Sequence, residues 1–206
     1  SGNIGLINCM IIGVNATQSI VSYGAVYQSQ GVCHQWDASG IIETLPIRLH
    51  DLMQHQGPLS KAIIILGPGS YTGIRLSLTA LKMLAVVHQI PIKGMSLFDG
   101  YMTLNSFQFD QLVLLTSPSR KGVVNAQLFQ SDRSSYHAVS SLLQFSFEKL
   151  NDFLARFQSP ILWRHFDEQC PNVDFQGQPV QLDLFHLMRV FESKDFNSNA
   201  TLQAIY

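Results

Sequence analysis

The sequence predicts an α/β fold divided into two lobes, each with a mixed sheet and helices, and three features carry this prediction. Residues 62–66 (AIIIL) are apolar and rich in β-branched side chains, as in a central parallel strand. A glycine-rich turn and a long helix that ends near His88 follow this strand. The segments 111–117 and 122–130 then indicate paired strands, so the second half repeats the pattern loosely. We expect an N-terminal lobe over 1–104 and a C-terminal lobe over 105–206.

The remaining elements follow from local patterns. Ahead of the glycine turn, a short apolar strand over 10–14 precedes a β-hairpin over 20–28 and 31–36. Apolar residues with a helical period predict a helix over 43–56, with Pro46 in its first turn. Strands are expected over 90–96 and 160–163, and amphipathic helices over 146–157 and 182–193. The turn between the paired strands of the second half is expected over 118–122.

Composition argues against several classes of function. Hydrophobic residues make up 46% of the 206 residues and charged residues only 13%, which indicates an apolar surface covered by a partner. The net charge of −1 creates no field that attracts nucleic acid. The three cysteines form no CxxC pair, no signal peptide is evident, and no apolar run reaches the roughly 18 residues of a membrane span. We therefore expect a cytoplasmic protein that binds no membrane.

The loop GPGSYTG, residues 67–73, matches none of the three best-known glycine motifs. It lacks the lysine and the spacing of a Walker A loop, and its glycines are one residue out of step with the dinucleotide fingerprint. Pro68 and Thr72 stand where a nucleophile elbow around Ser70 needs glycine. Two interpretations stay open, an anion site at the helix N-terminus and a tight turn in which Ser70 or Thr72 caps the helix. Sequence physics favours the turn.

The helix after this loop is apolar on two sides. One stripe consists of Ile74, Leu78, Leu81 and Ala85, and a nearly opposite stripe consists of Leu76, Ala80, Met83, Leu84 and Val87. Such a helix is buried twice, against its own sheet and against a second partner. That partner is the helix over 43–56, a second copy of the chain or another protein.

The stretch GPGSYTGIRLSLTALKMLA, residues 67–85, resembles the signature GxGPGS[FY]TGLRIG…AKGLA of the bacterial TsaB (YeaZ) family. Weaker similarity covers nearly the whole chain. MIIGVNATQS resembles the family's opening ILAIDTST, with Asn15 in the place of aspartate. ETLPIRLHDLM lies where the family has the helix HSERLLPALDELL, and VLLTSPSRKGVVNAQLF resembles VLAAIDARMGEVYWAEY. The terminal ATLQAIY resembles AEPVYLR.

This resemblance implies a two-lobed α/β fold of the actin-like, sugar-kinase-like ATPase superfamily, which is also ribonuclease H-like. It implies a non-catalytic scaffold subunit for the synthesis of threonylcarbamoyladenosine at position 37 of tRNA. The implied partners are a TsaD-like catalytic subunit, bound through the N-lobe helices, and a TsaE-like ATPase. A homodimer in isolation and contact with tRNA only through the complex are also implied. The resemblance further implies that ADP or ATP, if held at all, lies at the complex interface.

Two sets of site residues follow from the resemblance. The expected partner-binding residues are Leu45, Leu49, Leu52, Leu76, Ala80, Met83 and Leu84. The expected loop and nucleotide-proximal residues are Gly67, Gly69, Ser70, Thr72, Gly73 and Arg75. No catalytic residue and no metal ligand is assigned.

Departures from the family pattern argue against independent ATPase activity. Asn15 has the shape of aspartate without its charge and holds Mg²⁺ poorly. Residues 117–119 (SPS) replace a second acidic stretch. Two alternatives are kept, a small actin-like ATPase or kinase and a glycoprotease-type peptidase. The peptidase is opposed because HExxH is absent and because His50 and His55 are five residues apart.

Overall fold

The computed structural model describes residues 9–54, 57–133, 135–157, 159–166 and 178–192. As far as they are described, residues 1–100 and 183–206 form one compact unit and residues 101–182 form another. Two units were predicted, but the structure divides the chain differently. The C-terminal helix, expected in the second lobe, belongs to the first unit because it packs on the first sheet.

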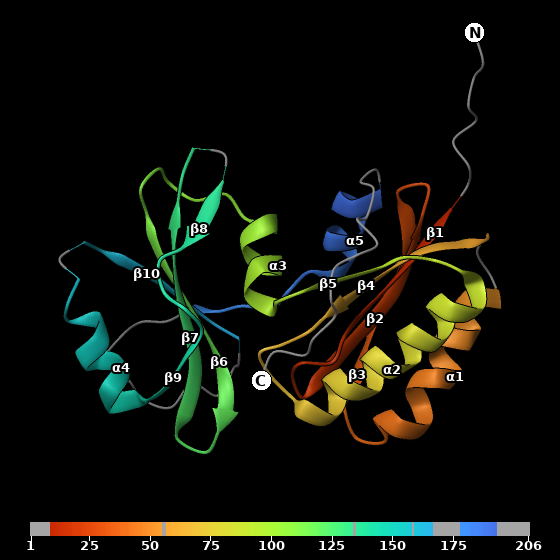
Figure 1. Cartoon of the computed structure of the whole chain (residues 1–206), viewed down its shortest axis with the longest axis horizontal. Helices are drawn as coiled ribbons and strands as arrows, with labels where there is room; N and C mark the ends of the chain where they lie inside the picture. Colours follow the sequence, from red (N-terminus) through yellow and green to blue (C-terminus); the bar gives the residue numbers. More distant parts are fainter. Residues whose placement is uncertain (1–8, 55–56, 134, 158, 167–177, 193–206) are drawn as a thin grey trace, which may run out of the picture. The chain divides into compact units, whose positions relative to one another are not determined.

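The first unit contains a five-stranded mixed sheet (Figure 1). Its elements in chain order are β1 (Met10–Asn15), β2 (Ile20–Tyr27), β3 (Gln30–Asp37), α1 (Ile41–Gln54), β4 (Leu59–Ile65), α2 (Tyr71–His88), β5 (Ile92–Met95) and α5 (Leu184–Glu192). The strand order is β3-β2-β1-β4-β5. The strands β1, β2 and β3 are antiparallel neighbours, whereas β4 runs parallel to β1 and to β5. Helix α3 (Leu97–Leu104) follows β5 and contains the boundary between the units.

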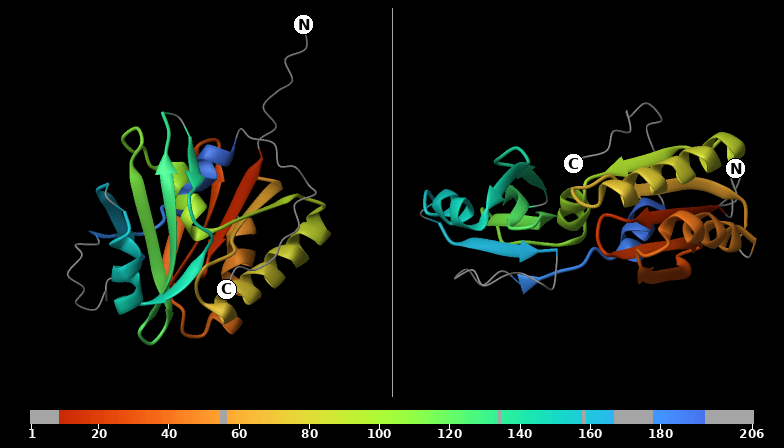
Figure 2. Two further views of the ribbon diagram at one scale, coloured as in Figure 1. Left: turned by 60° about the vertical axis from the view of Figure 1, so that its left-hand side comes forward. Right: turned by 90° about the horizontal axis from the view of Figure 1, so that it is seen from below.

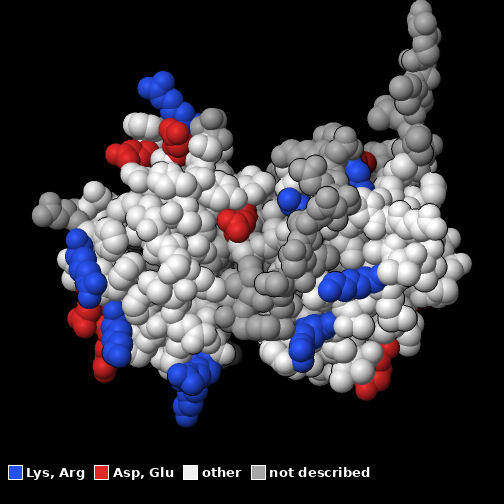
Figure 3. Space-filling model, in the orientation of Figure 1, with Lys and Arg blue, Asp and Glu red and all other residues white. Residues whose placement is uncertain are grey.

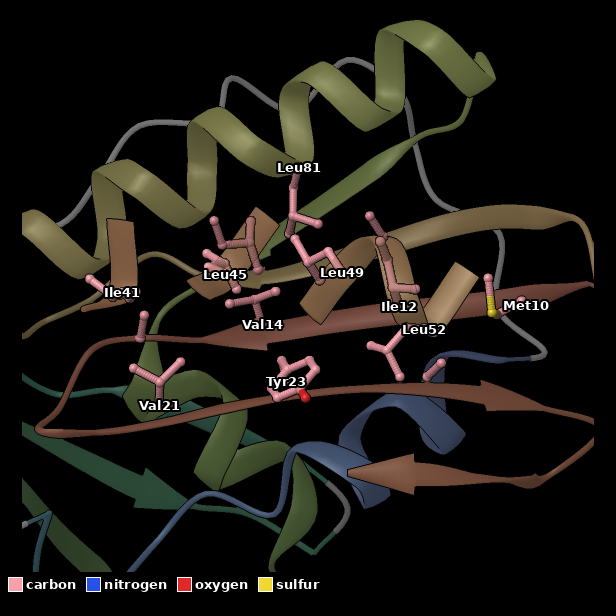
Figure 4. Close-up of a cluster of buried hydrophobic side chains, with 14 of the residues drawn as sticks. Met10, Ile12, Val14, Val21, Tyr23, Ile41, Leu45, Leu49, Leu52 and Leu81 are labelled. Carbon is pink, nitrogen blue, oxygen red and sulfur yellow. The ribbon is translucent and has the colours of Figure 1, made fainter. Parts of the chain in front are cut away.

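Helices α1 and α2 contact each other and cover one face of this sheet (Figure 4). Residues of β1 such as Ile12 and Val14 point toward these helices, as alternate residues of a strand must. Leu45, Leu49 and Leu52 of α1 are buried in the same cluster. Their helical spacing therefore marks the side of α1 that packs on its own sheet.

Helix α5 covers the opposite face and packs on β1, β2 and β3. Gly13 of β1 makes room for it, because a Cβ atom there would lie 2.7 Å from the sulfur of Met188. Leu184, Leu187 and Met188 are the buried side chains of this helix. A helix was predicted over 182–193; the structure has it over Leu184–Glu192, residue 193 lies outside the described residues, and the apolar side of the helix belongs to the core of the first unit.

The second unit is built on a mixed sheet of six strands. Its elements are β6 (Leu112–Arg120), β7 (Val123–Ser131), β8 (Tyr136–Ala138), β9 (Leu143–Ser146), α4 (Phe147–Leu154), β10 (Ile161–His165) and β11 (Gln178–Pro179). The order is β11-β10-β6-β7-β8, with β9 also paired to β7. Helix α4 packs on one side of this sheet, where Leu150 and Leu154 meet Leu114 and Trp163 (Figure 2).

Several element boundaries differ from the sequence prediction. Helix α1 begins two residues earlier than expected, so Pro46 lies in its second turn rather than in its first. The turn expected over 118–122 is shorter, because β6 continues through Pro118 with an irregular register and pairs Arg120 with Val123. Helix α4 ends at Leu154, before the expected end at 157. None of the described helices is long and apolar enough to cross a membrane.

Candidate functional site

The glycine loop connects β4 to α2 and is tied to the loop that follows β1. The backbone N–H of Ser70 donates to the carbonyl oxygen of Thr17 over 2.7 Å. The Ser70 hydroxyl oxygen accepts a hydrogen bond from the Gly73 N–H at 3.2 Å and so caps α2. Of the two caps considered from the sequence, Ser70 is the one observed.

Two of the glycines are required by this contact between backbones. A Cβ atom at Gly69 would overlap the carbonyl group of Thr17, and a Cβ atom at Gly73 would overlap the carbonyl oxygen of Ala16. Any larger residue would push the start of α2 away from the β1–β2 loop. This close approach is a structural reason for glycine at positions 69 and 73.

Asn15, which stands where the family pattern has aspartate, is engaged within its own turn. Its buried side-chain oxygen accepts hydrogen bonds from the N–H of Thr17 at 3.2 Å and from the Thr17 hydroxyl at 2.7 Å. The turn that Asn15 stabilises presents the Thr17 carbonyl to Ser70. Asn15 therefore helps to position α2 through the loop.

The remaining loop residues of the prediction differ in exposure, with Gly67 buried and Thr72 and Arg75 exposed. Thr72 and Arg75 are exposed on the first turns of α2, and the Arg75 guanidinium lies 4.6 Å from the ring centre of Tyr71. Within the described ranges, no three His, Cys, Asp or Glu side chains are grouped so that they could hold a metal ion. A nucleotide-proximal role for Gly67, Gly69, Ser70, Thr72, Gly73 and Arg75 stays a prediction.

The outer surface of α2 carries an apolar stripe, here called the α2 face. Its members are Thr72, Leu76, Thr79, Met83, Val86 and Val87. Met83, Val86 and Val87 are 65%, 77% and 73% exposed. The first five members are spaced alternately by four and three residues, which places them along one line of the helix. The exposed large apolar side chains on this side of the helix are therefore those of Met83, Val86 and Val87.

The seven predicted partner-binding residues fall into three groups. Leu45, Leu49 and Leu52 are buried in the core, so they offer no surface to a partner, and that part of the prediction is corrected. Leu76, Ala80 and Leu84 are half-buried and pack against the same core. Met83 alone of the seven is largely exposed.

Sequence reasoning missed some of this surface. Val86 was not in the predicted stripes, and Ile42 of α1 is also exposed, at 59%. The signal that could have found Val86 is the run of alternating spacings that starts at Thr72. Ile42 had no such signal, because both sides of α1 carry isoleucine or leucine.

Basic side chains border the α2 face. Arg75 and Lys82 are exposed and seven residues apart, which places them on the same side of the helix. The space-filling view shows a mostly uncharged surface in this region with separate basic groups (Figure 3). No acidic residue occurs between Tyr71 and His88.

In the second unit, the segment that replaces the family's acidic stretch is part of β6. Ser117 is buried, and its hydroxyl has no hydrogen-bond partner among the described residues. The neighbouring Thr116 oxygen receives a hydrogen bond from the Trp163 indole N–H at 2.7 Å and lies 2.7 Å from Nδ1 of His165. The contacts of Thr116 with Trp163 and His165 therefore link β6 to β10.

Comparisons with known proteins agree with the resemblance seen in the sequence. No family model matches the chain. A stretch of 82 residues is 37% identical to the tRNA threonylcarbamoyladenosine biosynthesis protein TsaB of Bacillus subtilis, covering 40% of this chain and 35% of that protein. The chain thus matches about a third of that protein's length.

Two solved structures share the fold. YeaZ from Pseudomonas aeruginosa superposes with a TM-score of 0.55 at 17% identity over 68% of each chain. A protein described as similar to the peptidase YeaZ from Pseudomonas aeruginosa gives a TM-score of 0.62 at 13% identity, over 96% of this chain and 99% of that one. The predicted two-lobed α/β fold is confirmed, and it is the fold of these YeaZ structures.

Proposed function

We propose that this chain is a TsaB-type protein that acts in the synthesis of threonylcarbamoyladenosine in tRNA, as a non-catalytic subunit that binds a TsaD-type catalytic subunit. The observation that carries the proposal is the exposed apolar stripe on α2, directly after a loop with the TsaB signature. The name of the Bacillus subtilis relative supports the pathway.

The α2 face has the properties of a helix-binding surface. Met83, Val86 and Val87 present large apolar side chains to solvent, and burial of each would contribute about 1.5–3 kcal/mol. Their neighbours Thr72, Thr79 and Ala80 are small, which permits close approach of a second helix. A helix of the partner laid along α2 would remove this surface from water.

The loop contributes to this function by fixing the helix. Gly69 and Gly73 allow the start of α2 to rest on the β1–β2 loop, and Ser70 caps it. Such contacts hold an interface helix in one orientation before binding, which reduces the entropy lost on association. The signature residues therefore serve the interface without taking part in chemistry.

Nucleotide and the remaining partners are a further part of the proposal. Ser70, Thr72 and Arg75 are the exposed members of the predicted loop set, so they are the residues that ADP or ATP held at the subunit boundary would meet. Arg75 supplies a cation for phosphate. A TsaE-like ATPase and tRNA would join through the catalytic subunit, since the chain's net charge of −1 gives it no general attraction for RNA.

The test is complementation in Bacillus subtilis cells depleted of their own TsaB, together with expression of this chain and its cognate TsaD-type subunit. Threonylcarbamoyladenosine in total tRNA is measured by mass spectrometry of nucleosides. We expect wild-type chain to restore the modified nucleoside and the Met83→Asp variant to fail, because the carboxylate would be buried at the interface.

The matched control is Phe109→Asp. Phe109 is 65% exposed, as Met83 is, but belongs to the second unit. This variant should restore modification as the wild type does. Unmodified tRNA with the wild-type chain, or full modification with Met83→Asp, would count against the proposed function.

A further inference from the structure

Four side chains from three elements of the first unit form a cluster, here called the Arg48 cluster. Its members are Tyr23 of β2, His34 and Trp36 of β3, and Arg48 of α1. Across the hairpin, Tyr23 pairs with His34 and Val21 pairs with Trp36. Because Tyr23 and Val21 belong to the core cluster under α1, His34 and Trp36 project from that same side of the sheet.

The three rings pack on one another, and Arg48 lies over them. The ring centres of Tyr23 and His34 are 5.2 Å apart in a stacked arrangement, and those of Tyr23 and Trp36 are 5.0 Å apart, edge to face. The Arg48 guanidinium carbon lies 4.9 Å from the centre of the Trp36 ring, and Nη1 of Arg48 donates to the Tyr23 hydroxyl oxygen at 3.2 Å. Tyr23 is buried, Trp36 and Arg48 are half-buried, and His34 is exposed, so the cluster reaches the surface.

The cluster holds hydrogen-bond donors that lack an acceptor. The Nε1 atom of Trp36 is buried and has no hydrogen-bond partner. A guanidinium has five N–H donors, and within the described ranges Arg48 makes one hydrogen bond, to Tyr23, and no ion pair with a carboxylate. Since buried donors in proteins are normally paired, an acceptor placed beside Arg48 and Trp36 would complete the cluster.

The acidic residues that lie near the cluster in the sequence are placed elsewhere. The Asp37 carboxylate accepts a hydrogen bond from the Ser39 N–H at 2.8 Å, and as the neighbour of Trp36 in β3 it projects from the other side of the strand. Asp51 follows Arg48 by three residues on the same side of α1, but it is exposed and not paired with Arg48. The described part of the chain therefore gives the Arg48 cluster no anion of its own.

We propose that the Arg48 cluster binds a carboxylate, either of a small organic acid or of an acidic side chain. A planar guanidinium holds a carboxylate through two parallel N–H donors, and Arg48 is the one permanent cation of the cluster, which matches a single negative charge. The Trp36 indole has no hydrogen bond to lose when its ring turns, so its N–H supplies a further donor to the same carboxylate. Val32 lies on the same side of β3 and is 38% exposed, so it offers apolar surface to the rest of the ligand.

The test follows the indole N–H signals of the ¹⁵N-labelled full chain by NMR during titration with benzoate. The chain has two tryptophans, and the Trp36 signal is identified by its loss in Trp36→Phe. We expect benzoate to shift the Trp36 signal in a saturable way. The Trp163 signal should stay in place, because that indole already donates to Thr116 in the second unit. Benzamide, the neutral amide of the same shape, should cause no such shift.

Arg48→Gln should weaken benzoate binding about tenfold or more, because a hydrogen bond to a charged group is lost. The matched control is Arg133→Gln. Arg133 also lies beside an aromatic ring, 5.6 Å from the centre of Phe109, but in the second unit, and its replacement should leave the affinity unchanged. Titration with N-acetylglutamic acid α-amide distinguishes the two sources of the carboxylate, since tighter binding than that of benzoate assigns an acidic side chain and weaker binding assigns a small acid.

Three results would overturn the proposal: no saturable shift of the Trp36 signal with either carboxylate, an equal shift with benzamide, or equal affinity of Arg48→Gln and wild type. A dispersed amide spectrum verifies that Arg48→Gln is folded. Should this variant not fold, the comparison of benzoate with benzamide on the wild type decides alone. The cluster lies on β2, β3 and α1 and the chain is studied without a partner, so the outcome does not depend on the proposed function.

Discussion

The backbone N–H of Ser70 and the carbonyl oxygen of Thr17 are 2.7 Å apart, and this hydrogen bond joins the start of α2 to the loop after β1. Gly69 and Gly73 lie on either side of it, and both are too close to the β1–β2 loop to carry a side chain. The most recognisable part of the sequence therefore sets the position of a helix. The exposed surface of that helix is where we place the function.

Gly73→Ala tests whether the loop contact outweighs helix propensity. Alanine in a helix is favoured over glycine by up to about 1 kcal/mol, so propensity alone predicts a more stable protein. The contact with the Ala16 carbonyl predicts the opposite, a loss of about 1–3 kcal/mol from overpacking. Urea unfolding measures the difference. A gain in stability would show that the two loops do not pack as described.

Leu49→Ala tests the reassignment of the α1 leucines from interface to core. Leu49 is 2% exposed, and truncation should lower the free energy of unfolding by about 2–5 kcal/mol. Met83→Ala, on the exposed side of α2, should change it by less than about 0.5 kcal/mol. Chemical denaturation of both variants decides. Similar, small effects at both positions would place Leu49 on the surface.

Thr116→Val tests the polar contact between β6 and β10. The Thr116 oxygen accepts a hydrogen bond from Trp163, and removing it from this buried site should cost about 1–3 kcal/mol. Thr79→Val makes the same chemical change on the exposed side of α2 and should have little effect. Thermal unfolding followed by tryptophan fluorescence reports both. An unchanged midpoint for Thr116→Val would argue against the contact.

Cys33 should react slowly with iodoacetamide. Partial burial of the thiol, and secondarily the Asp183 carboxylate, raise the pKa of Cys33 above the usual value, so less thiolate is present near pH 8. Asp183→Asn removes the negative charge and should lower that pKa, which would speed alkylation. Asparagine also keeps the cap that Asp183 provides to the His186 N–H. Mass spectrometry of time points measures the rate at this residue, and a slower reaction in Asp183→Asn would contradict the assigned cause.

Local sequence patterns predicted most of the secondary structure, because strand and helix periods depend on nearby residues. The apolar run of β4, the glycine turn and the inward stripe of α2 with Ile74 and Leu81 are confirmed. Such local patterns did not predict which elements pack against each other when they are far apart in the sequence. The period of α5 showed one apolar side, but nothing local indicated that this side packs on the first sheet.

The site was predictable only in part for the same reason. Leu45 and Met83 both belong to apolar stripes, yet one faces the core and the other faces solvent. Whether an apolar stripe of a helix faces the core depends on which other element covers it. For a helix with two apolar sides, the sequence does not tell which side packs on the sheet. The position of β3 at the edge of the sheet was likewise not predicted, because the hairpin pattern does not tell which strand ends the sheet.

Binding of the cognate TsaD-type subunit, measured by isothermal titration calorimetry, tests the central claim that the α2 face is the partner surface. Wild type and Phe109→Asp should bind with equal affinity, and Met83→Asp should bind about 30-fold more weakly or not at all, as expected for the loss of about 2 kcal/mol at an interface anchor. Circular dichroism would verify that both variants are folded. Equal affinity of Met83→Asp and wild type would contradict the assignment of the α2 face.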